Sequence, residues 1–157
     1  DEASQALQFY RERFAVTGLF ENEVYEGIEK LLKDLNKLNY RLAVATSKPI
    51  VYAKQILDFF NLSKYFEVIV GSELDGTRSA KGDVIEEVLK QMKIEKKDQC
   101  VMIGDRKHDL IGASENGIDS IGVTYGYGSQ QELEDANATY IVHSVDSLSI
   151  IFGKEAK

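Results

Sequence analysis

From residue 41 onward, short runs of β-branched and other apolar residues alternate with stretches of helical periodicity. This alternation is typical of βαβ units, in which each strand is followed by a helix that leads to the next parallel strand. Strands are expected at residues 41–45, 67–70, 99–103, 120–123 and 140–142. Helices are expected at residues 50–60, 82–92, 108–116, 130–136 and 145–152. The sequence therefore predicts an α/β fold built on a Rossmann-like parallel sheet with helices on both faces.

Two further helices are expected ahead of the first strand. Apolar residues at helical spacing predict an amphipathic helix over residues 24–38. Residues 3–18 also have a helical pattern, and they include Phe9, Tyr10 and Phe14 at helical spacing. We expect these three aromatic side chains to pack against other residues rather than to bind a cofactor.

Composition and charge exclude several classes of function. The 157 residues, of which 43% are apolar, are enough for about one globular domain with a sizeable core. No apolar run approaches the ~20 residues of a membrane span, and no segment resembles a signal peptide. The net charge of −7 argues against a nucleic-acid partner. The lone Cys100 lies in an expected strand, which predicts a buried thiol, no disulfide and a cytoplasmic protein.

Polar side chains follow two of the expected strands where a ligand could bind. Thr46 and Ser47 end the first strand, where hydroxyl groups and the N–H groups of a following helix could receive an anion. A Ser or Thr at this position is equally a common helix N-cap. Lys81 begins a later helix, at the end where the helix dipole opposes a cation, and a nearby anion would offset that repulsion. A solvated surface lysine is the alternative.

An acidic loop follows the expected strand at 99–103. Gly104, Asp105 and Asp109 form a glycine-hinged segment with two carboxylates four residues apart. Mg²⁺ prefers oxygen ligands and needs only one or two protein carboxylates beside a substrate phosphate. Ligands of open α/β sheets lie beyond the carboxyl ends of the strands, which is where Asp105 falls. The alternative is that Asp105 simply ends a strand and Asp109 favours the dipole of the next helix.

A hydroxyl, a lysine and an acidic loop thus follow successive strands in this order. Here the chain resembles the haloacid dehalogenase-like (HAD) phosphohydrolases, particularly their phosphoglycolate-phosphatase-like branch. Residues 42–49 resemble the second motif of that family, residues 78–81 the third and residues 104–109 the fourth. With the flanking Tyr-Gly-Tyr-Gly at 125–128, the resemblance covers nearly all of residues 20–152.

The resemblance implies a magnesium-dependent phosphatase that attacks a small phosphate ester through an aspartyl-phosphate. In such an enzyme Thr46, Ser47 and Lys81 would bind the phosphoryl group, and the catalytic residues among those present would be Thr46, Lys81 and Asp105. Asp105 would coordinate Mg²⁺ as the metal ligand, and Asp109 would support the metal loop. Dehalogenase or mutase activity also remains open within the superfamily.

The resemblance also divides the chain into domains. Residues 1–20 would be the C-terminal part of a helical cap, and residues 21–157 would be a HAD-like core that lacks its first strand. The family's nucleophile is the first aspartate of a DxDGT motif on that strand. Residues 73–77, Glu-Leu-Asp-Gly-Thr, imitate the motif, but they fall between the second and third motifs and carry Glu in place of the attacking Asp. We expect Asp75 and Gly76 to form a turn.

In the fold that the chain resembles, the absent strand lies between the strands at 41–45 and 99–103. Unpaired N–H and C=O groups along a buried edge are costly. We therefore expect the edge to be filled by an upstream segment or by a second chain.

Two other functions are alternatives to a phosphatase. One is a noncatalytic phosphate- or partner-binding α/β module. The other is a response-regulator receiver, whose expected order of acidic residues and lysine differs from the one found here.

Overall fold

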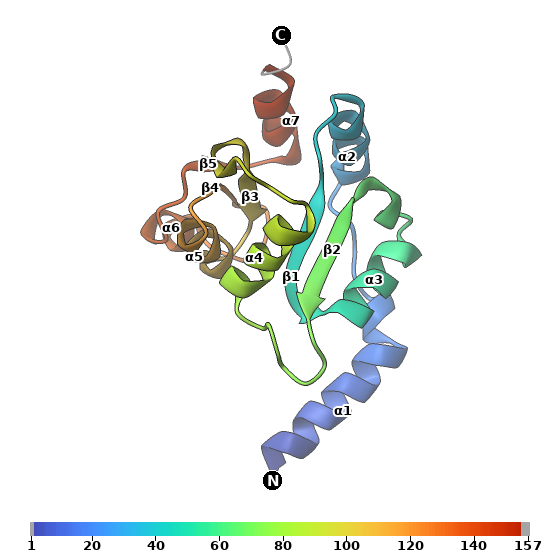
Figure 1. The fold of residues 1–157 in the computed structure, drawn as a ribbon. Helices are drawn as coiled ribbons and strands as arrows, with labels where there is room; N and C mark the ends of the chain where they lie inside the picture. Colours follow the sequence, from blue (N-terminus) through green and yellow to red (C-terminus); the bar gives the residue numbers. More distant parts are fainter. Residues whose placement is uncertain (1, 155–157) are drawn as a thin grey trace.

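The computed structural model describes residues 2–154, without the side chains of residues 15 and 20. The helices are α1 (Glu2–Val16), α2 (Ile28–Lys37), α3 (Ile50–Phe59), α4 (Lys81–Gln91), α5 (Lys107–Glu115), α6 (Gln130–Asp135) and α7 (Val145–Lys154). The strands are β1 (Ala43–Pro49), β2 (Val68–Ser72), β3 (Val101–Gly104), β4 (Asp119–Val123) and β5 (Tyr140–Val142). Single turns of 3₁₀ helix occur at η1 (Gly18–Phe20), η2 (Ser63–Tyr65) and η3 (Lys97–Gln99). The chain therefore alternates strand and helix from β1 onward, as its sequence pattern predicts (Figure 1).

The strands form two parallel sheets. β1 pairs with β2, and β4 lies between β3 and β5. α4 covers β1 and β2, where Val84 and Val88 pack with Val70, and it also contacts α5. On β4, Ile121 packs with Leu148 of α7 and with residues of α2. The predicted α/β fold, with parallel strands and helices on both faces, is confirmed.

Two element boundaries differ from the sequence prediction. The helix expected from residue 24 begins only at Ile28, because Gly27 has a φ of +85°, a left-handed conformation outside the helical range. The first strand continues to Pro49 and does not end at residue 45, although its pairing with β2 shifts register between Ala45 and Pro49. Thr46 and Ser47 therefore lie within an irregular final stretch of β1.

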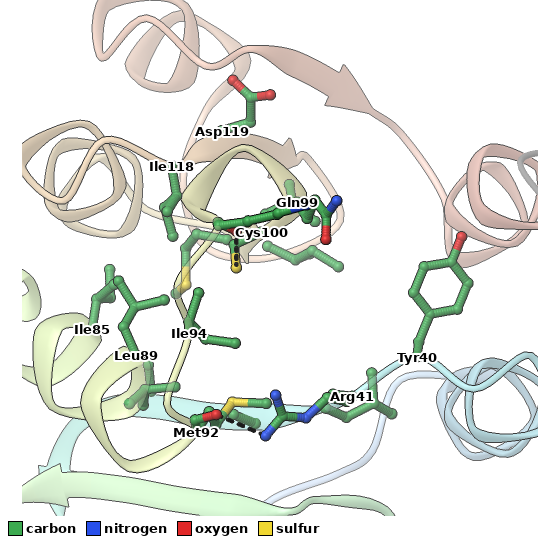
Figure 2. A pocket seen from close by; sticks show the side chains of 18 of the residues that line it. Tyr40, Arg41, Ile85, Leu89, Met92, Ile94, Gln99, Cys100, Ile118 and Asp119 are labelled. Atoms are coloured by element: carbon green, nitrogen blue, oxygen red, sulfur yellow. Dashed lines mark hydrogen bonds between the residues drawn. The ribbon is translucent and has the colours of Figure 1, made fainter.

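A groove of about 970 Å³ separates β1 from β3. Within the described residues these two strands are not paired with each other. Apolar side chains of α4 and α7, such as Ile85, Leu89 and Phe152, line the groove together with residues of both strands. Figure 2 shows the open space between Arg41 and Met92 on one wall and Gln99 and Cys100 on the other. The expectation that 41–45 and 99–103 do not pair directly is confirmed.

Some side chains of α1 and at the start of β3 are more exposed than expected. Phe9 of α1 is 70% exposed, so the prediction that it packs is wrong. Tyr10 is 62% exposed, but its ring stacks on Phe14 with centroids 5.8 Å apart. Cys100 is only half-buried, just ahead of β3, and the prediction of a buried strand thiol is also wrong. The reason is the groove, which leaves this side of β3 uncovered and exposes 36% of Val101 as well. Among the helices described, none is long and apolar enough to span a membrane.

Candidate functional site

The Lys81 side chain brings the polar groups of three different βα units together. Its ammonium donates a hydrogen bond of 3.1 Å to the carbonyl of Ala45, the residue before Thr46. The same ammonium lies 2.8 Å from Oδ1 of Asp109, which is four residues beyond Asp105. Both side chains of this ion pair are nearly buried, with exposures of 13% and 9%. The Lys81 ammonium thus connects β1, at the residue before Thr46, with the first turn of α5, four residues after Asp105.

The close approach of α4 and α5 makes this connection possible. At Gly112, an added Cβ would lie 3.0 Å from the backbone nitrogen of Gly82, and at Gly82 it would collide with the side chain of Glu115. Small residues at both positions therefore let the first turn of α4 lie against α5. Lys81, the first residue of α4, is in this way placed beside Asp109 in the first turn of α5.

Both carboxylate oxygens of Asp109 are engaged. Oδ1 pairs with Lys81, and Oδ2 accepts a 3.1 Å hydrogen bond from the backbone N–H of Arg106, which precedes α5. Asp109 therefore caps the start of α5 by accepting from the N-cap N–H, which is one half of a capping box, since the Arg106 side chain cannot accept a hydrogen bond in return. A side chain at Gly104 would collide with Asp109, so the end of β3 must be glycine for the carboxylate to fit. This arrangement suits a residue that supports the loop.

Asp105 is oriented differently. Its Oδ2 accepts a 2.8 Å hydrogen bond from the N–H of Tyr127, and its backbone carbonyl accepts one of 2.9 Å from the N–H of Gly128. A side chain at Gly126 or Gly128 would collide with Asp105. The Tyr-Gly-Tyr-Gly segment thus cradles this residue with its backbone. Oδ1 has no hydrogen-bond or ion-pair partner among residues 2–154, and so it is available to a ligand.

Two tyrosine rings border Asp105. Tyr25 and Tyr125 meet edge to face, with centroids 5.2 Å apart. Burial raises the pKa of Tyr125 to about 12, with the nearby Tyr25 and the Asp105 carboxylate adding to the effect. Burial, followed by the charge of Asp105, raises the pKa of Tyr25. Both phenols therefore keep their protons at neutral pH and do not add negative charge beside Asp105.

The Thr46 hydroxyl does not cap a helix. It accepts a 3.1 Å hydrogen bond from the backbone N–H of Lys48, while the N-cap of α3 is Pro49, which has no side-chain cap. The alternative that Thr46 or Ser47 is simply an N-cap of α3 is therefore wrong. The backbone of this turn is anchored by Ser72, whose hydroxyl donates to the carbonyl of Ser47 over 2.9 Å.

The donor set allows a test of the expected magnesium ion. No group of three or more His, Cys, Asp or Glu side chains able to hold a metal occurs among the described residues. Mg²⁺ does not need such a cage, because waters and substrate phosphate commonly complete its octahedron. In the part of the chain that the structure describes, one carboxylate oxygen of Asp105 has no partner, whereas both oxygens of Asp109 are bound. The residues present therefore fit Mg²⁺ with Asp105 as the direct ligand.

Sequence analysis did not identify Glu132 as part of this region. Its Oε1 accepts hydrogen bonds from the Arg106 side chain, over 2.8 Å, and from the Lys107 N–H, over 2.9 Å. These hydrogen bonds hold the pKa of Glu132 below its ordinary value. Glu132 lies on α6, 26 residues after Arg106, and no local pattern connects the two. His108, in the first turn of α5, is exposed.

The DxDGT-like segment at 73–77 forms a turn, as expected. The N–H of Gly76 donates to the carbonyl of Glu73 over 3.0 Å, and Gly76 has a φ of +88°. The Asp75 carboxylate accepts a 2.8 Å hydrogen bond from the N–H of Thr77. Asp75 therefore stabilises its own loop.

Comparison with known proteins agrees with the sequence motifs. The family model of the haloacid dehalogenase-like hydrolases matches residues 2–123. A 5'-nucleotidase of Pseudomonas aeruginosa is 49% identical over 142 residues, which are 89% of this chain and 64% of that protein. The tyrosine-protein kinase PtkA of Mycobacterium tuberculosis is 37% identical over 155 residues, which are 98% of this chain and 53% of that protein. The chain thus spans less than two thirds of these relatives.

A solved structure is similar over a larger share of its length. The crystal structure of a predicted phosphatase from Clostridium acetobutylicum has a TM-score of 0.93 and 51% identity, covering 98% of this chain and 72% of that one. The expected resemblance to the phosphoglycolate-phosphatase branch is also confirmed. The phosphoglycolate phosphatase of Colwellia psychrerythraea is 27% identical over 145 residues, covering 92% of this chain and 64% of that protein.

Proposed function

The chain belongs to the haloacid dehalogenase-like hydrolase family, and on this premise we propose that it is the core of a magnesium-dependent phosphatase. Its substrate would be a small phosphate monoester. The observation that carries the proposal is the Lys81 ammonium, which contacts both the carbonyl of Ala45 in β1 and the carboxylate of Asp109 and thereby joins three βα units. Phosphoryl transfer depends mainly on positioning and on stabilising the charge of the equatorial oxygens, and this arrangement is suited to both.

Each residue has a separate role in the proposed reaction. The Thr46 hydroxyl and the Ser47 backbone would donate hydrogen bonds to the transferring phosphoryl group, and Lys81 would offset its charge. An attacking carboxylate would form a bond to phosphorus while the bond to the ester oxygen breaks, giving an aspartyl-phosphate and releasing the alcohol. Water would then cleave the acyl-phosphate and restore the carboxylate.

Asp105 would hold the magnesium ion through Oδ1, and Asp109 would keep the loop in place through Arg106 and Lys81. When bound, Mg²⁺ would neutralise part of the phosphate charge. The Tyr127 N–H fixes Oδ2 of Asp105, which orients Oδ1 before any ion arrives.

The attacking carboxylate requires a strand that the described residues do not supply. We propose that a parallel strand fills the groove between β1 and β3 and that it carries the nucleophile at its carboxyl end. β1 and β3 both end at the edge of the sheet where Lys81 and Asp105 lie, so a strand between them would deliver its last residue to the same place. Nothing in the comparisons supports a second chain as its source.

The test joins such a strand to the chain. An apolar strand ending in Asp-x-Asp-Gly-Thr, linked ahead of residue 1, should allow Mg²⁺-dependent hydrolysis of p-nitrophenyl phosphate, whereas the 157-residue chain alone should not hydrolyse it. The matched control replaces only the first Asp of the added motif by Asn and should be inactive while folding equally well. Activity of the 157-residue chain alone would contradict the proposed nucleophile.

One alternative is a noncatalytic phosphate-binding or partner-binding module. In that case the strand-filled protein would bind phosphate without turning over any ester. Phosphate binding that depends on Lys81, together with no hydrolysis by the strand-filled protein, would favour the module over the enzyme.

A further inference from the structure

A single carboxylate oxygen from α6 binds the proposed metal loop, residues 104–109. Oε1 of Glu132 accepts a 2.8 Å hydrogen bond from Nε of Arg106 and one of 2.9 Å from the backbone N–H of Lys107. Both donors lie inside the loop, directly after Asp105. The N-cap of α5 is Arg106, whose side chain has no hydrogen-bond acceptor, so the first N–H of that helix finds its acceptor on α6.

Glu132 is held in place by the fold. The Ser129 hydroxyl accepts a 3.1 Å hydrogen bond from the Glu132 N–H and thereby caps α6. The next residue, Leu133, is fully buried and packs against β4, where a Cβ at Gly122 would lie 3.2 Å from its side chain. Figure 1 shows α5 and α6 side by side. The Glu132 carboxylate therefore reaches the metal loop from a fixed helix.

The segment ahead of Glu132 also holds Asp105. The N–H groups of Tyr127 and Gly128 donate to Asp105, the first to Oδ2 over 2.8 Å and the second to the backbone carbonyl over 2.9 Å. Residues 125–132 thus bind Asp105 as well as the two residues that follow it. Loss of the Glu132 contacts would therefore reach Asp105 through the backbone of the loop.

The Glu132 carboxylate also determines where the Arg106 guanidinium lies. Glu132 is the only carboxylate in an ion pair with Arg106 among residues 2–154, and the pair is partly exposed, 46% for Arg106 and 23% for Glu132. Partly exposed pairs contribute little to stability, so the larger effect is on the position of the guanidinium. A guanidinium released from Glu132 would lie next to Asp105, where it would compete with a metal ion for the carboxylate.

We propose that Glu132 is a positioning residue of the magnesium site. It holds the residues between Asp105 and Asp109 in the geometry that binds the ion, and it keeps the Arg106 guanidinium away from Oδ1 of Asp105. This inference rests on the proposed function, in which that oxygen binds Mg²⁺, and it extends the site from the metal loop to α6.

The test measures the dissociation constant of Mg²⁺ by titration calorimetry on the 157-residue chain at pH 7. Glu132→Ala removes the accepting oxygen and its charge, and it should weaken Mg²⁺ binding about tenfold, as loss of a residue that supports a metal ligand does. Glu132→Gln keeps an acceptor oxygen at the same distance from the backbone, and it should restore most of the affinity that Glu132→Ala loses.

Two variants on or next to the same helix separate this role from a general loosening of α6. Glu134→Ala removes a carboxylate whose only hydrogen bond within the described residues comes from Gln130, and it should bind Mg²⁺ as the wild type does. Ser129→Ala removes the N-cap of α6 but leaves the Glu132 carboxylate, so it should lower the Tm with little effect on Mg²⁺ binding. If Ser129→Ala weakens Mg²⁺ binding as much as Glu132→Ala does, the inference is wrong.

A double-variant cycle with Arg106→Ala tests whether Glu132 restrains the guanidinium. Removing the Arg106 side chain takes away one positive charge near the metal site in either background. If Glu132 holds the guanidinium away from Asp105, Arg106→Ala should increase the Mg²⁺ affinity about threefold more in the Glu132→Ala protein than in the wild type. An equal gain in both backgrounds would contradict the restraint.

Hydrogen exchange of the metal-free protein gives a measurement that does not involve Mg²⁺. The Tyr127 N–H donates to Asp105, so its exchange rate reports whether that carboxylate keeps its orientation. Glu132→Ala should speed the exchange of the Tyr127 N–H more than Ser129→Ala does. Equal acceleration in the two variants would mean that Glu132 acts only through the stability of α6, which overturns its positioning role.

The remaining outcomes separate this inference from the proposed function. Asp105→Asn should abolish Mg²⁺ binding. If it does so while Glu132→Ala binds Mg²⁺ as tightly as the wild type, the role of Glu132 is wrong and the metal site stands. If the wild type binds no Mg²⁺, or Asp105→Asn binds it unchanged, the proposed metal site is wrong, and the inference about Glu132 is overturned with it.

Discussion

The ammonium of Lys81 lies 2.8 Å from the carboxylate of Asp109, and this ion pair ties the first turn of α4 to the first turn of α5. It is among the least exposed charged pairs in the described structure, whereas pairs such as Lys30 with Asp34 lie in solvent. Exposed pairs contribute little to stability, but a nearly buried one is costly to break from one side only. Lys81 and Asp109 should therefore be strongly coupled in stability as well as in function.

Removing one partner of this pair should destabilise the fold. We expect Lys81→Met to lower the free energy of unfolding by about 3 kcal/mol, because Asp109 would keep a buried charge without its counter-ion. The double variant Lys81→Met, Asp109→Asn should be clearly more stable than the sum of the single changes allows. Urea denaturation of the four proteins measures this coupling, and additive effects would show that the two side chains do not interact.

The two carboxylates should differ in their effect on magnesium. Asp105→Asn removes the charge of the proposed direct ligand but can keep the hydrogen bond from Tyr127, so Mg²⁺ binding should be lost while the fold remains. Asp109→Asn should weaken binding about tenfold, as loss of a supporting residue does. Calorimetric titration with Mg²⁺ distinguishes the two. Asp135→Asn on α6 makes the same charge change at an exposed position, and it should bind as the wild type does.

Glycine at position 126 is required by the close approach of Asp105. Gly126→Ala would push a methyl group into the Asp105 side chain, so we expect a loss of about 1–3 kcal/mol in stability and weaker Mg²⁺ binding. Gly153→Ala is the matched control, since no atom lies near the added methyl in α7, and a gain of up to about 1 kcal/mol is expected there. Thermal unfolding of both variants measures the contrast. An unchanged Gly126→Ala protein would contradict the cradle around Asp105.

Glu132 should contribute a stability that depends on pH. Its pKa in the folded protein lies below the ordinary value of 4.5, because the carboxylate accepts hydrogen bonds from the Lys107 N–H and from Arg106. The contribution is therefore fully present above the unfolded pKa and is lost as the pH falls through the folded pKa. Glu132→Gln should lower the Tm at pH 7, and the difference from wild type should shrink on acidification.

The control for this pH effect is Glu134→Gln on the same helix. Among the described residues, its carboxylate accepts a hydrogen bond only from the Gln130 side chain, one turn earlier, and it contacts no residue at the α5 terminus. We expect a smaller Tm change at pH 7 than for Glu132→Gln. If the Tm difference between Glu132→Gln and wild type is the same at pH 3 and pH 7, the carboxylate does not act through its charge.

The alternation of strands and helices could be predicted from the sequence because it depends on local periodicity. β-branched runs and apolar residues at helical spacing indicate the secondary structure of the segment in which they occur. The observed elements lie within a few residues of their expected positions. The order of Thr46, Lys81 and Asp105 along successive βα units predicts that these residues lie at one edge of the sheet, since parallel strands bring their carboxyl ends there. The structure places the Lys81 ammonium against the Ala45 carbonyl and the Asp109 carboxylate. The ends of the elements were harder to predict from the sequence. At Gly27, for example, one residue in a left-handed conformation makes the helix begin later than expected.

Only the tertiary structure decided which carboxylate oxygens are bound by other residues and which can bind a ligand. Both oxygens of Asp109 are bound by Lys81 and Arg106, while one oxygen of Asp105 has no partner within residues 2–154, and sequence spacing cannot distinguish the two carboxylates. The contact of Lys48 with the Phe14 ring likewise joins segments 34 residues apart. Periodicity is a local property of the chain, whereas hydrogen-bond partners and burial depend on which distant segments pack together.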